Sequence, residues 1–401
     1  MITNRISRLG VHICFIALFA VLGGSLRGFN LLLIVAGLLF GTLIIQWRLA
    51  RRIGEKLTVR QRSLPDVFAD EPFTVRYSLK NESRWLPAWL IELIVPITPA
   101  SKTSTTPVLK GRCGVGLLSA QASQEPHFHC VIHRRGRYHL GPASAVTRFP
   151  FGFTTSTTTD PQTTQEIYVY PRQLALRPRW DELLAAQNRG LKTTSNRAGM
   201  NEGNFYGLRG WQHGDSRRWI HWRTTARLDT LAVRQFEQQR RHEYCLILDT
   251  SVDPDADDSE KTQTEKFEHT LSLTSTLLLR LTQLPSNRVS LIIAGATVES
   301  LQVTNARLAI QQAMRRLAES QPLRKKADTT AANLFPAILA GMELSGKNTP
   351  SLVISSRPKD PQRLVPQEGT GWHGAQDISW LQADGPLASL LIAEEKTDAS
   401  T

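Results

Sequence analysis

The sequence predicts a multidomain protein with an N-terminal transmembrane helical hairpin, an all-β sandwich and a C-terminal α/β domain of the Rossmann type. Three observations carry this prediction: two long apolar runs near the N-terminus, a stretch of short alternating strands, and a later alternation of buried strands with helices. At 401 residues the chain exceeds one average domain. We place the hairpin at residues 1–56, the sandwich at 57–172, a linker at 173–202 and the α/β domain at 203–401.

The N-terminal hairpin consists of two apolar runs, residues 9–26 and 31–47, joined by residues 27–30. Each run is close to the length that a helix needs to cross a bilayer. A secretory signal peptide has a single apolar run and a small-residue cleavage site, so the second run argues against one. We therefore expect a pair of helices that anchors the chain in the lipid bilayer.

Basic residues flank the hairpin on both sides and predict its orientation. They are Arg5, Arg8, Arg48, Arg51, Arg52 and Lys56. Because the cytoplasmic flanks of membrane helices are enriched in Lys and Arg, both ends of the hairpin should stay in the cytoplasm. We expect an inner (plasma) membrane protein whose soluble domains lie in the cytoplasm. The formal net charge of +13 favours acidic partners or anionic lipid.

Cysteine usage is consistent with a reducing compartment. The chain has four cysteines: Cys14, Cys113, Cys130 and Cys245. Cys14 lies in an apolar run and Cys245 in a predicted buried strand. Reduced thiols are the expectation, and a disulfide between Cys113 and Cys130 is the alternative.

The predicted sandwich is built from short strands with turn residues between them. Residues 73–80 alternate apolar and polar side chains with a period of two, as a half-buried strand does. Residues 89–95 and 127–133 are further strands, and the spacing favours a sandwich. The Thr-rich residues 154–164 are predicted to form a surface loop.

Three histidines share one face of the strand predicted at residues 127–133. His127, His129 and His133 lie on that face, while Phe128 and Ile132 lie on the other. A metal site needs ligands that converge in a fixed geometry. We interpret the histidines as the solvated face of a strand whose other face is apolar.

The last domain alternates strands and helices, which predicts a mostly parallel sheet covered on both faces. Residues 244–248, 289–293 and 351–354 are predicted strands, and residues 387–393 are predicted to close the sheet. Apolar residues at helical spacing predict helices over residues 267–281, 308–317 and 331–344.

Asp249 and Ser251 follow the first of these strands, and Asp253 comes two residues later. Ligands of open parallel sheets bind beyond the carboxyl ends of the strands. The pattern resembles part of the metal-ion-dependent adhesion site of von Willebrand factor A domains, Asp-x-Ser-x-Ser, with Asp253 in place of the third ligand. The resemblance implies a von Willebrand factor A-like domain and suggests Mg²⁺ as a cofactor. The alternative is that Asp occurs here for its turn chemistry alone.

Residues 207–237 gather six arginines and three tryptophans just ahead of that strand. They are Arg209, Arg217, Arg218, Arg223, Arg227 and Arg234, with Trp211, Trp219 and Trp222. Asp215 is a candidate N-cap for a helix over residues 217–228. In that helix Trp219, Trp222, Ile220 and Ala226 would form an inward stripe.

Three arginines at the edges of this stripe could then pair with nearby carboxylates: Arg217, Arg223 and Arg227 with residues such as Asp215, Asp229 and Glu237. Guanidinium groups bind carboxylates bidentately, so such pairs would clamp the segment against the sheet. If the pair is buried, Arg227→Ala should cost about 3–5 kcal/mol of stability.

Three ligands compete with the internal clamp. Arginines with aromatics can bind single-stranded nucleic acid, but no nucleic-acid-binding motif accompanies them here. Glycines such as Gly214 could let the backbone approach a phosphate, but the chain lacks the G-x-x-x-x-G-K-[ST] sequence of a P-loop. Anionic lipid is the third ligand.

The order of these residues is similar to the signature of the bacterial domain-of-unknown-function family fifty-eight. The shared positions, which we take as a signature and partner face, are Arg209, Gly214, Asp215, Arg217, Arg218, Trp222, Arg227 and Glu237. The chain departs from the pattern at His221, where Asp is usual, and at Thr225, where Ser is usual. Members of this family often sit beside MoxR-type AAA+ ATPases.

The resemblance implies a non-enzymatic adaptor or scaffold that works with a MoxR-type AAA+ ATPase, and with other protein clients, in complex assembly or maturation. No catalytic set such as Ser-His-Asp stands out, and we expect no nucleic acid as a partner. The alternative is a nucleic-acid or anionic-ligand binding protein that uses the same arginines. A hydrolase dependent on Asp249 is a third and weaker option.

Overall fold

A computed structural model of the chain describes residues 2–28, 30–100, 108–178, 180, 205–213, 215–236, 242–252, 260–283, 287–323, 334–345, 349, 351–359 and 378–391. The chain forms two compact units. The first comprises Met1–Arg172 with Arg315–Glu319, and the second comprises Gln173–Met314 with Ser320–Thr401.

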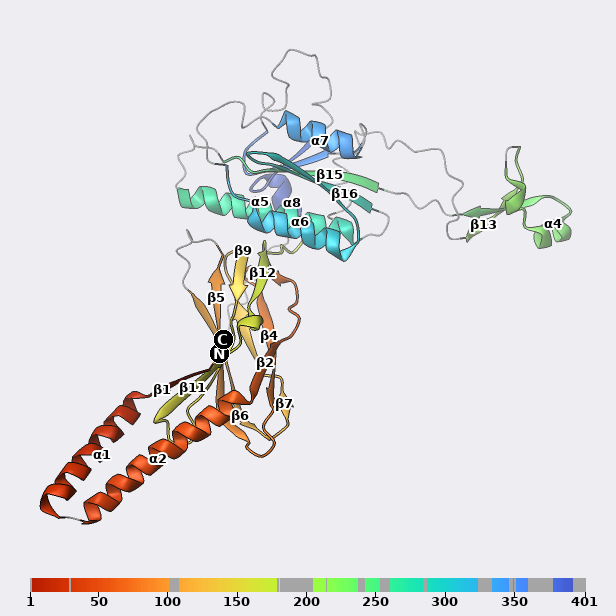
Figure 1. Cartoon of the computed structure of the whole chain (residues 1–401). Coiled ribbons are helices and arrows are strands. Elements are labelled where there is room, and N and C mark those ends of the chain that lie inside the picture. The colour runs from red at the N-terminus through yellow and green to blue at the C-terminus, as the bar shows by residue number, and fades with distance from the viewer. Residues whose placement is uncertain are drawn as a thin grey trace. The chain divides into compact units, whose positions relative to one another are not determined.

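The two predicted N-terminal helices are present as α1 (Arg8–Arg27) and α2 (Asn30–Glu55), which lie side by side (Figure 1). Ser7 caps the start of α1, and Gly28 ends it in the left-handed conformation at φ 65°. Both helices are long and apolar enough to cross a membrane, with mean hydropathies of 2.2 and 2.0. Most of their apolar side chains are exposed, as a lipid-facing surface requires.

The β region of the first unit has two sheets around one core. The larger sheet has eight strands in the order β1-β11-β10-β5-β9-β12-β3, with β6 paired to β5, and the smaller has the order β2-β4-β7, with β8 paired to β4. The strands are β1 (Ile2–Ile6), β2 (Leu57–Gln61), β3 (Val67–Phe68), β4 (Pro72–Asn81), β5 (Ala88–Pro99), β6 (Leu109–Leu118), β7 (Ser123–Gln124), β8 (His127–Val131), β9 (Gly136–Leu140), β10 (Ser144–Thr147), β11 (Thr154–Thr159) and β12 (Gln165–Tyr170).

The core between these sheets is made by the alternating residues of the strands. In β4 the side chains of Val75, Tyr77 and Leu79 are fully buried, and the residues between them are not. Ile53 of α2 joins the same core. The second helix is therefore part of the β unit at its C-terminal end.

The Thr-rich stretch was wrongly predicted as a surface loop. Residues 154–159 form strand β11, which pairs with β10 on one side and with β1 on the other. Threonine is β-branched and favours strands. The partner strand β1 is distant in the sequence, so the local pattern of residues 154–164 does not indicate the pairing.

The second unit contains a five-stranded sheet of order β17-β16-β15-β18-β19, in which only β17 is antiparallel to its neighbour. The strands are β15 (His242–Asp249), β16 (Asn287–Ala294), β17 (Val298–Val303), β18 (Ser351–Ser355) and β19 (Ile378–Gln382), and the helices are α5 (Glu260–Thr282), α6 (Arg307–Glu319), α7 (Phe335–Ser345) and α8 (Pro386–Leu391). The mixed α/β architecture agrees with the prediction.

One predicted strand of this sheet was wrong. Residues 387–393 were expected to close the sheet, but residues 386–391 form helix α8, and β19 takes the edge position beside β18. Pro386 at the first position of the helix and the turn before it explain the helical start.

Candidate functional site

The arginine- and tryptophan-rich segment forms a two-stranded sheet with its connection, which we call the Arg/Trp hairpin (residues 205–236). Its two strands, β13 (Phe205–Gly210) and β14 (Ala232–Phe236), pair antiparallel (Figure 1). The connection between them carries a 3₁₀ turn, η3 (Arg217–Trp219), and a helix, α4 (Trp222–Leu228). The backbone N–H of His221 donates to the carbonyl of Ala232 at 2.8 Å, which fastens the connection to the second strand.

The start of the connection is closed by an arginine–carboxylate pair in which Asp215 was a predicted partner but Arg209 was not. The two terminal guanidinium nitrogens of Arg209, Nη1 and Nη2, each donate to the carboxylate of Asp215 at 2.7 Å, and the backbone N–H of Gln212 donates to the same carboxylate at 2.8 Å. These donors stabilise the ionised form, so the pKa of Asp215 is lowered, first by Arg209 and then by Gln212. The prediction that Asp215 caps a helix was wrong, because its carboxylate closes this loop instead.

Helix α4 is capped by His221, one of the residues that depart from the family signature. The His221 ring nitrogen Nδ1 lies 3.3 Å from the backbone N–H of Thr224 and accepts from it. The hydroxyl of Thr225 accepts from the backbone N–H of Ala232 at 3.0 Å. Both residues thus provide the acceptors that the more usual Asp and Ser could provide at these positions.

The other predicted clamp residues do not turn inward. Trp222 is 67% exposed, and Arg217, Arg218, Arg223 and Arg227 are also exposed. Within the described part of the chain, no ion pair joins these four arginines to a carboxylate. The inward stripe was wrong because the expected single helix is broken at Ile220 into η3 and α4, so helical spacing no longer aligns Trp219 with Trp222. Gly214 and Glu237 lie outside the described residues.

A second candidate site lies at the carboxyl edge of the five-stranded sheet. Asp249, at the end of β15, is 1% exposed, and its carboxylate accepts from the Ser251 hydroxyl at 2.6 Å and from the Ser251 backbone N–H at 3.0 Å. The other oxygen accepts from the hydroxyl of Ser355, at the end of β18, at 2.7 Å. The edge therefore brings one carboxylate and two hydroxyls together below the surface.

These hard oxygen donors fit Mg²⁺, which binds through one or two carboxylates with other oxygen ligands. Each serine hydroxyl donates its hydrogen to Asp249, and the Ser355 oxygen also accepts from the backbone N–H of Arg357 at 3.0 Å. Asp253, the third predicted ligand, lies outside the described residues. Over the ranges that the structure describes, no group of three His, Cys, Asp or Glu side chains is placed to hold a metal ion.

Sequence reasoning did not include Ser355 in this cluster. It lies 106 residues after Asp249, and the two residues meet because β15 and β18 are adjacent parallel strands. The position of Ser355 at the end of a buried strand could have indicated this contact, because the carboxyl ends of parallel strands lie at the same edge of the sheet.

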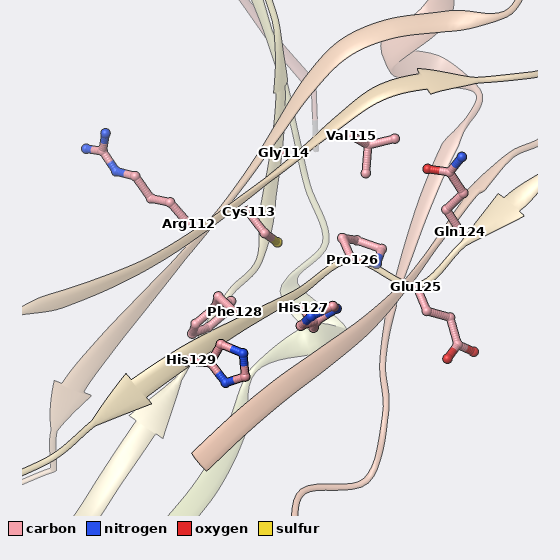
Figure 2. Close-up of a pocket in the computed structure, with 10 residues that line it drawn as sticks. All are labelled: Arg112, Cys113, Gly114, Val115, Gln124, Glu125, Pro126, His127, Phe128 and His129. Carbon is pink, nitrogen blue, oxygen red and sulfur yellow. The ribbon is translucent and has the colours of Figure 1, made fainter. Parts of the chain in front are cut away.

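Two of the three histidines, His127 and His129, form the solvated strand face that the sequence predicted, whereas β8 ends before His133, whose ring lies 2.8 Å from the Asp70 carboxylate. His127 and His129 are exposed and Phe128 is buried between them. Figure 2 shows the two imidazoles beside an open hollow lined by residues 112–115 and 124–129, with Arg112 and Glu125 extending away from it. Cys113 lies in the same hollow, and burial raises the pKa of its thiol to about 11, so the thiol is not a nucleophile at neutral pH.

Comparisons with solved structures find likenesses that are short and distant. The alkylpurine DNA glycosylase AlkC of Pseudomonas fluorescens is 14% identical over 28% of this chain and 30% of its own, with a TM-score of 0.21. The CARDB domain of a Pyrococcus furiosus protein is 15% identical over 28% of this chain and 86% of its own (TM-score 0.20). A superoxide reductase of Ignicoccus hospitalis is 16% identical over 28% and 79% (TM-score 0.19). At these TM-scores the likenesses carry no structural argument.

None of the curated proteins compared with the chain matches it. In the comparison with family models, residues 207–336 match the family described as "Protein of unknown function DUF58". The match includes the Arg/Trp hairpin from Gly207 onward, strand β15 and the Asp249 edge of the sheet. The match confirms the resemblance to the DUF58 family that the signature residues indicated.

Proposed function

We propose that this protein is a non-enzymatic, membrane-anchored adaptor that binds partner proteins through the exposed surface of the Arg/Trp hairpin. The observation that carries the proposal is the exposure of Trp222 together with the four exposed arginines around it. Tryptophan and arginine dominate the energetic centres of protein interfaces. Guanidinium groups pair bidentately with carboxylates, so the partner surface is acidic.

The helices α1 and α2 tether the adaptor to the inner membrane. The basic residues at both ends of the pair support a cytoplasmic location for the soluble units. A MoxR-type AAA+ ATPase is the partner that the family resemblance suggests, and complex assembly or maturation is the process.

The carboxyl edge of the sheet is the second contact in this proposal. The strand order, with an antiparallel edge strand beside parallel ones, supports a von Willebrand factor A-like domain. Asp249, Ser251 and Ser355 would hold Mg²⁺ there, together with Asp253 from the predicted pattern. Bound Mg²⁺ would supply positive charge toward a carboxylate of the partner.

The test is a binding measurement between the full chain in lipid nanodiscs and the purified MoxR-type ATPase of the same organism, with and without ATP. Trp222→Ala and Arg227→Ala should each weaken binding by roughly thirty-fold, equal to about 2 kcal/mol. Leu308→Ala, an exposed position in α6, is the matched control and should bind as the wild type does. Arg227→Ala should leave the melting temperature unchanged, because Arg227 is exposed. Wild-type affinity in both hairpin variants would rule out the hairpin as the partner face.

The same exposed arginines support a second candidate function, the binding of nucleic acid or another anionic ligand. Single-stranded nucleic acid binds to basic surfaces with aromatic side chains, and its affinity falls steeply with salt. Retention of the full chain on single-stranded DNA at 0.15 M salt, lost with Trp222→Ala, would favour this function over the adaptor.

A further inference from the structure

We propose that the turn between β10 and β11, residues 148–153, contacts the lipid bilayer as a third membrane anchor. The proposal rests on the membrane tether of the proposed function and names a contact beyond it. We call these residues the aromatic turn. Its aromatic residues are Phe149, Phe151 and Phe153.

The aromatic turn is held against α1 by direct backbone contacts. The backbone N–H of Ser7 donates to the carbonyl of Phe153 at 2.8 Å, and the Ser7 hydroxyl donates to the carbonyl of Gly152 at 2.6 Å. A Cβ atom at Gly10 would lie only 2.1 Å from the Phe153 carbonyl oxygen. The first turn of α1 and the aromatic turn can therefore approach this closely only with glycine at position 10.

The aromatic turn is also held against α2, through a single buried glutamine. Gln46 is 0% exposed, its amide nitrogen lies 3.3 Å from the carbonyl of Arg148, and its amide oxygen accepts from the Phe153 N–H at 3.3 Å. Figure 1 shows β1 and β11 next to the ends of α1 and α2 that connect to the β strands. The turn is thus fixed to both helices at one level.

The turn contacts both helices at the position where their apolar surface ends and polar residues begin. Immediately before Gln46 the exposed residue is Ile45, and immediately after it come Trp47 and Arg48. In α1 the corresponding change lies between Arg8 and Leu9. Tryptophan and basic residues mark the interface between lipid and water, so the aromatic turn lies at that interface.

The side chains of the turn match the chemistry of the interface. Phe151 is 53% exposed and stacks on Phe153 with the ring centroids 5.5 Å apart, while Phe149 stacks on Trp89. Aromatic rings held by neighbours lose little conformational entropy when they enter lipid. Arg5, Arg8 and Arg148 are exposed nearby in the same structure and complement anionic headgroups.

The test is spin-label accessibility in the full chain, reconstituted in nanodiscs with the four native cysteines replaced by alanine. Labels are placed at Phe151→Cys, at Phe19→Cys on α1 as the lipid reference, and at Val131→Cys on β8 as the water reference. We expect the label at position 151 to be more accessible to oxygen and less accessible to a water-soluble nickel chelate than the label at position 131, with values between those at positions 131 and 19. We also expect the protection to increase when phosphatidylglycerol is added to phosphatidylcholine.

The outcomes separate this proposal from the one it rests on. A label at position 19 that reports water would overturn the membrane tether and the turn contact together. A label at position 19 in lipid, with position 151 behaving like position 131, would overturn only the turn contact. Equal protection in the two lipid mixtures would reject the role of the arginines. Cross-linking of the unmodified chain to phospholipids with a photoreactive acyl chain, mapped to residues 149–153, provides the same test without any substitution.

Discussion

The carboxylate of Asp215 stabilises the loop of the Arg/Trp hairpin through its hydrogen bonds, which favour its ionised form. Three donors, two from Arg209 and one from Gln212, converge on its carboxylate. In the unfolded chain the same carboxylate would be solvated by water. The folded hairpin therefore favours the ionised form, which links its stability to pH.

We predict that the hairpin loosens in acid because of this residue. The pKa of Asp215 is lowered in the folded state, so its contribution is complete above the unfolded pKa of about 3.9 and is lost as pH falls through the lower folded value. Amide NMR signals of residues 205–213 should be unchanged from pH 7 to about pH 5 and shift below about pH 4. Asp215→Asn should remove this transition, and an identical pH profile in both proteins would contradict the assignment.

His221 leads to a second prediction at the same scale. His221→Ala removes the side-chain acceptor at the start of α4 and should lower the local stability of the helix by about 1 kcal/mol. His221→Asp restores an acceptor and should keep the stability. The measurement is native-state hydrogen exchange of the Thr224 amide, which bonds to the His221 ring. Equal protection in the alanine variant would show that the cap contributes nothing.

Among the elements, α7 packs against the sheet more closely than its composition indicates. Gly341 faces strand β15, and a Cβ atom there would lie 2.7 Å from the Sγ of Cys245 and 3.7 Å from Ile292. Cys245 is 1% exposed, and burial raises the pKa of its thiol to about 11. The thiol acts as a small apolar side chain that fills the space left by the glycine.

Gly341→Ala should therefore destabilise the α/β unit by about 1–3 kcal/mol through overpacking. Cys245→Ala removes the atom nearest to the new methyl group, so the double variant should recover part of this loss. Urea unfolding of the full chain, followed by tryptophan fluorescence, measures both. Gly210→Ala is the control, because nothing lies within 4 Å of its added Cβ. A double variant no more stable than Gly341→Ala would show that the strain arises elsewhere.

At the scale of the whole molecule, the first unit joins the apolar helices α1 and α2 to the β strands without an intervening linker. Strand β1 pairs with β11 directly before α1 begins, and α2 leads into β2 after Ile53 has entered the core. A helix pair bonded in this way to a folded unit can orient that unit relative to the bilayer. We therefore expect that a change that unfolds the β strands also disrupts the helix pair.

A charge in the middle of α2 should release the chain from the membrane. Leu38 is 65% exposed in α2, and Leu38→Lys would cost about 2.5–3.5 kcal/mol of insertion free energy if it lies at the bilayer centre. We expect a large drop in the membrane fraction that resists carbonate extraction, measured by immunoblotting. Leu308→Lys introduces the same charge at an exposed position in α6, outside the two N-terminal helices, and should leave the fraction unchanged. Full retention of the Leu38 variant would argue against a spanning helix.

The local patterns of the sequence were sufficient for most elements. The apolar runs became α1 and α2, the alternation at residues 73–80 became β4, and the buried strands at residues 244–248 and 289–293 became β15 and β16. The signature residues were also sufficient to identify the DUF58 family. These features depend on interactions between residues that are close in the chain, or on residue identity alone.

Only the tertiary structure decided how distant residues meet. It paired the Thr-rich β11 with β1, placed Ser355 on the carboxylate of Asp249, and left Trp222 and Arg227 exposed where a single amphipathic helix would have turned the tryptophan inward. Helical and strand periodicity reports which face of an element is apolar, but it does not report which element covers that face or where a helix breaks. The strand pairing and the Ser355 contact join residues more than a hundred positions apart, and the packing of the whole chain determines such contacts.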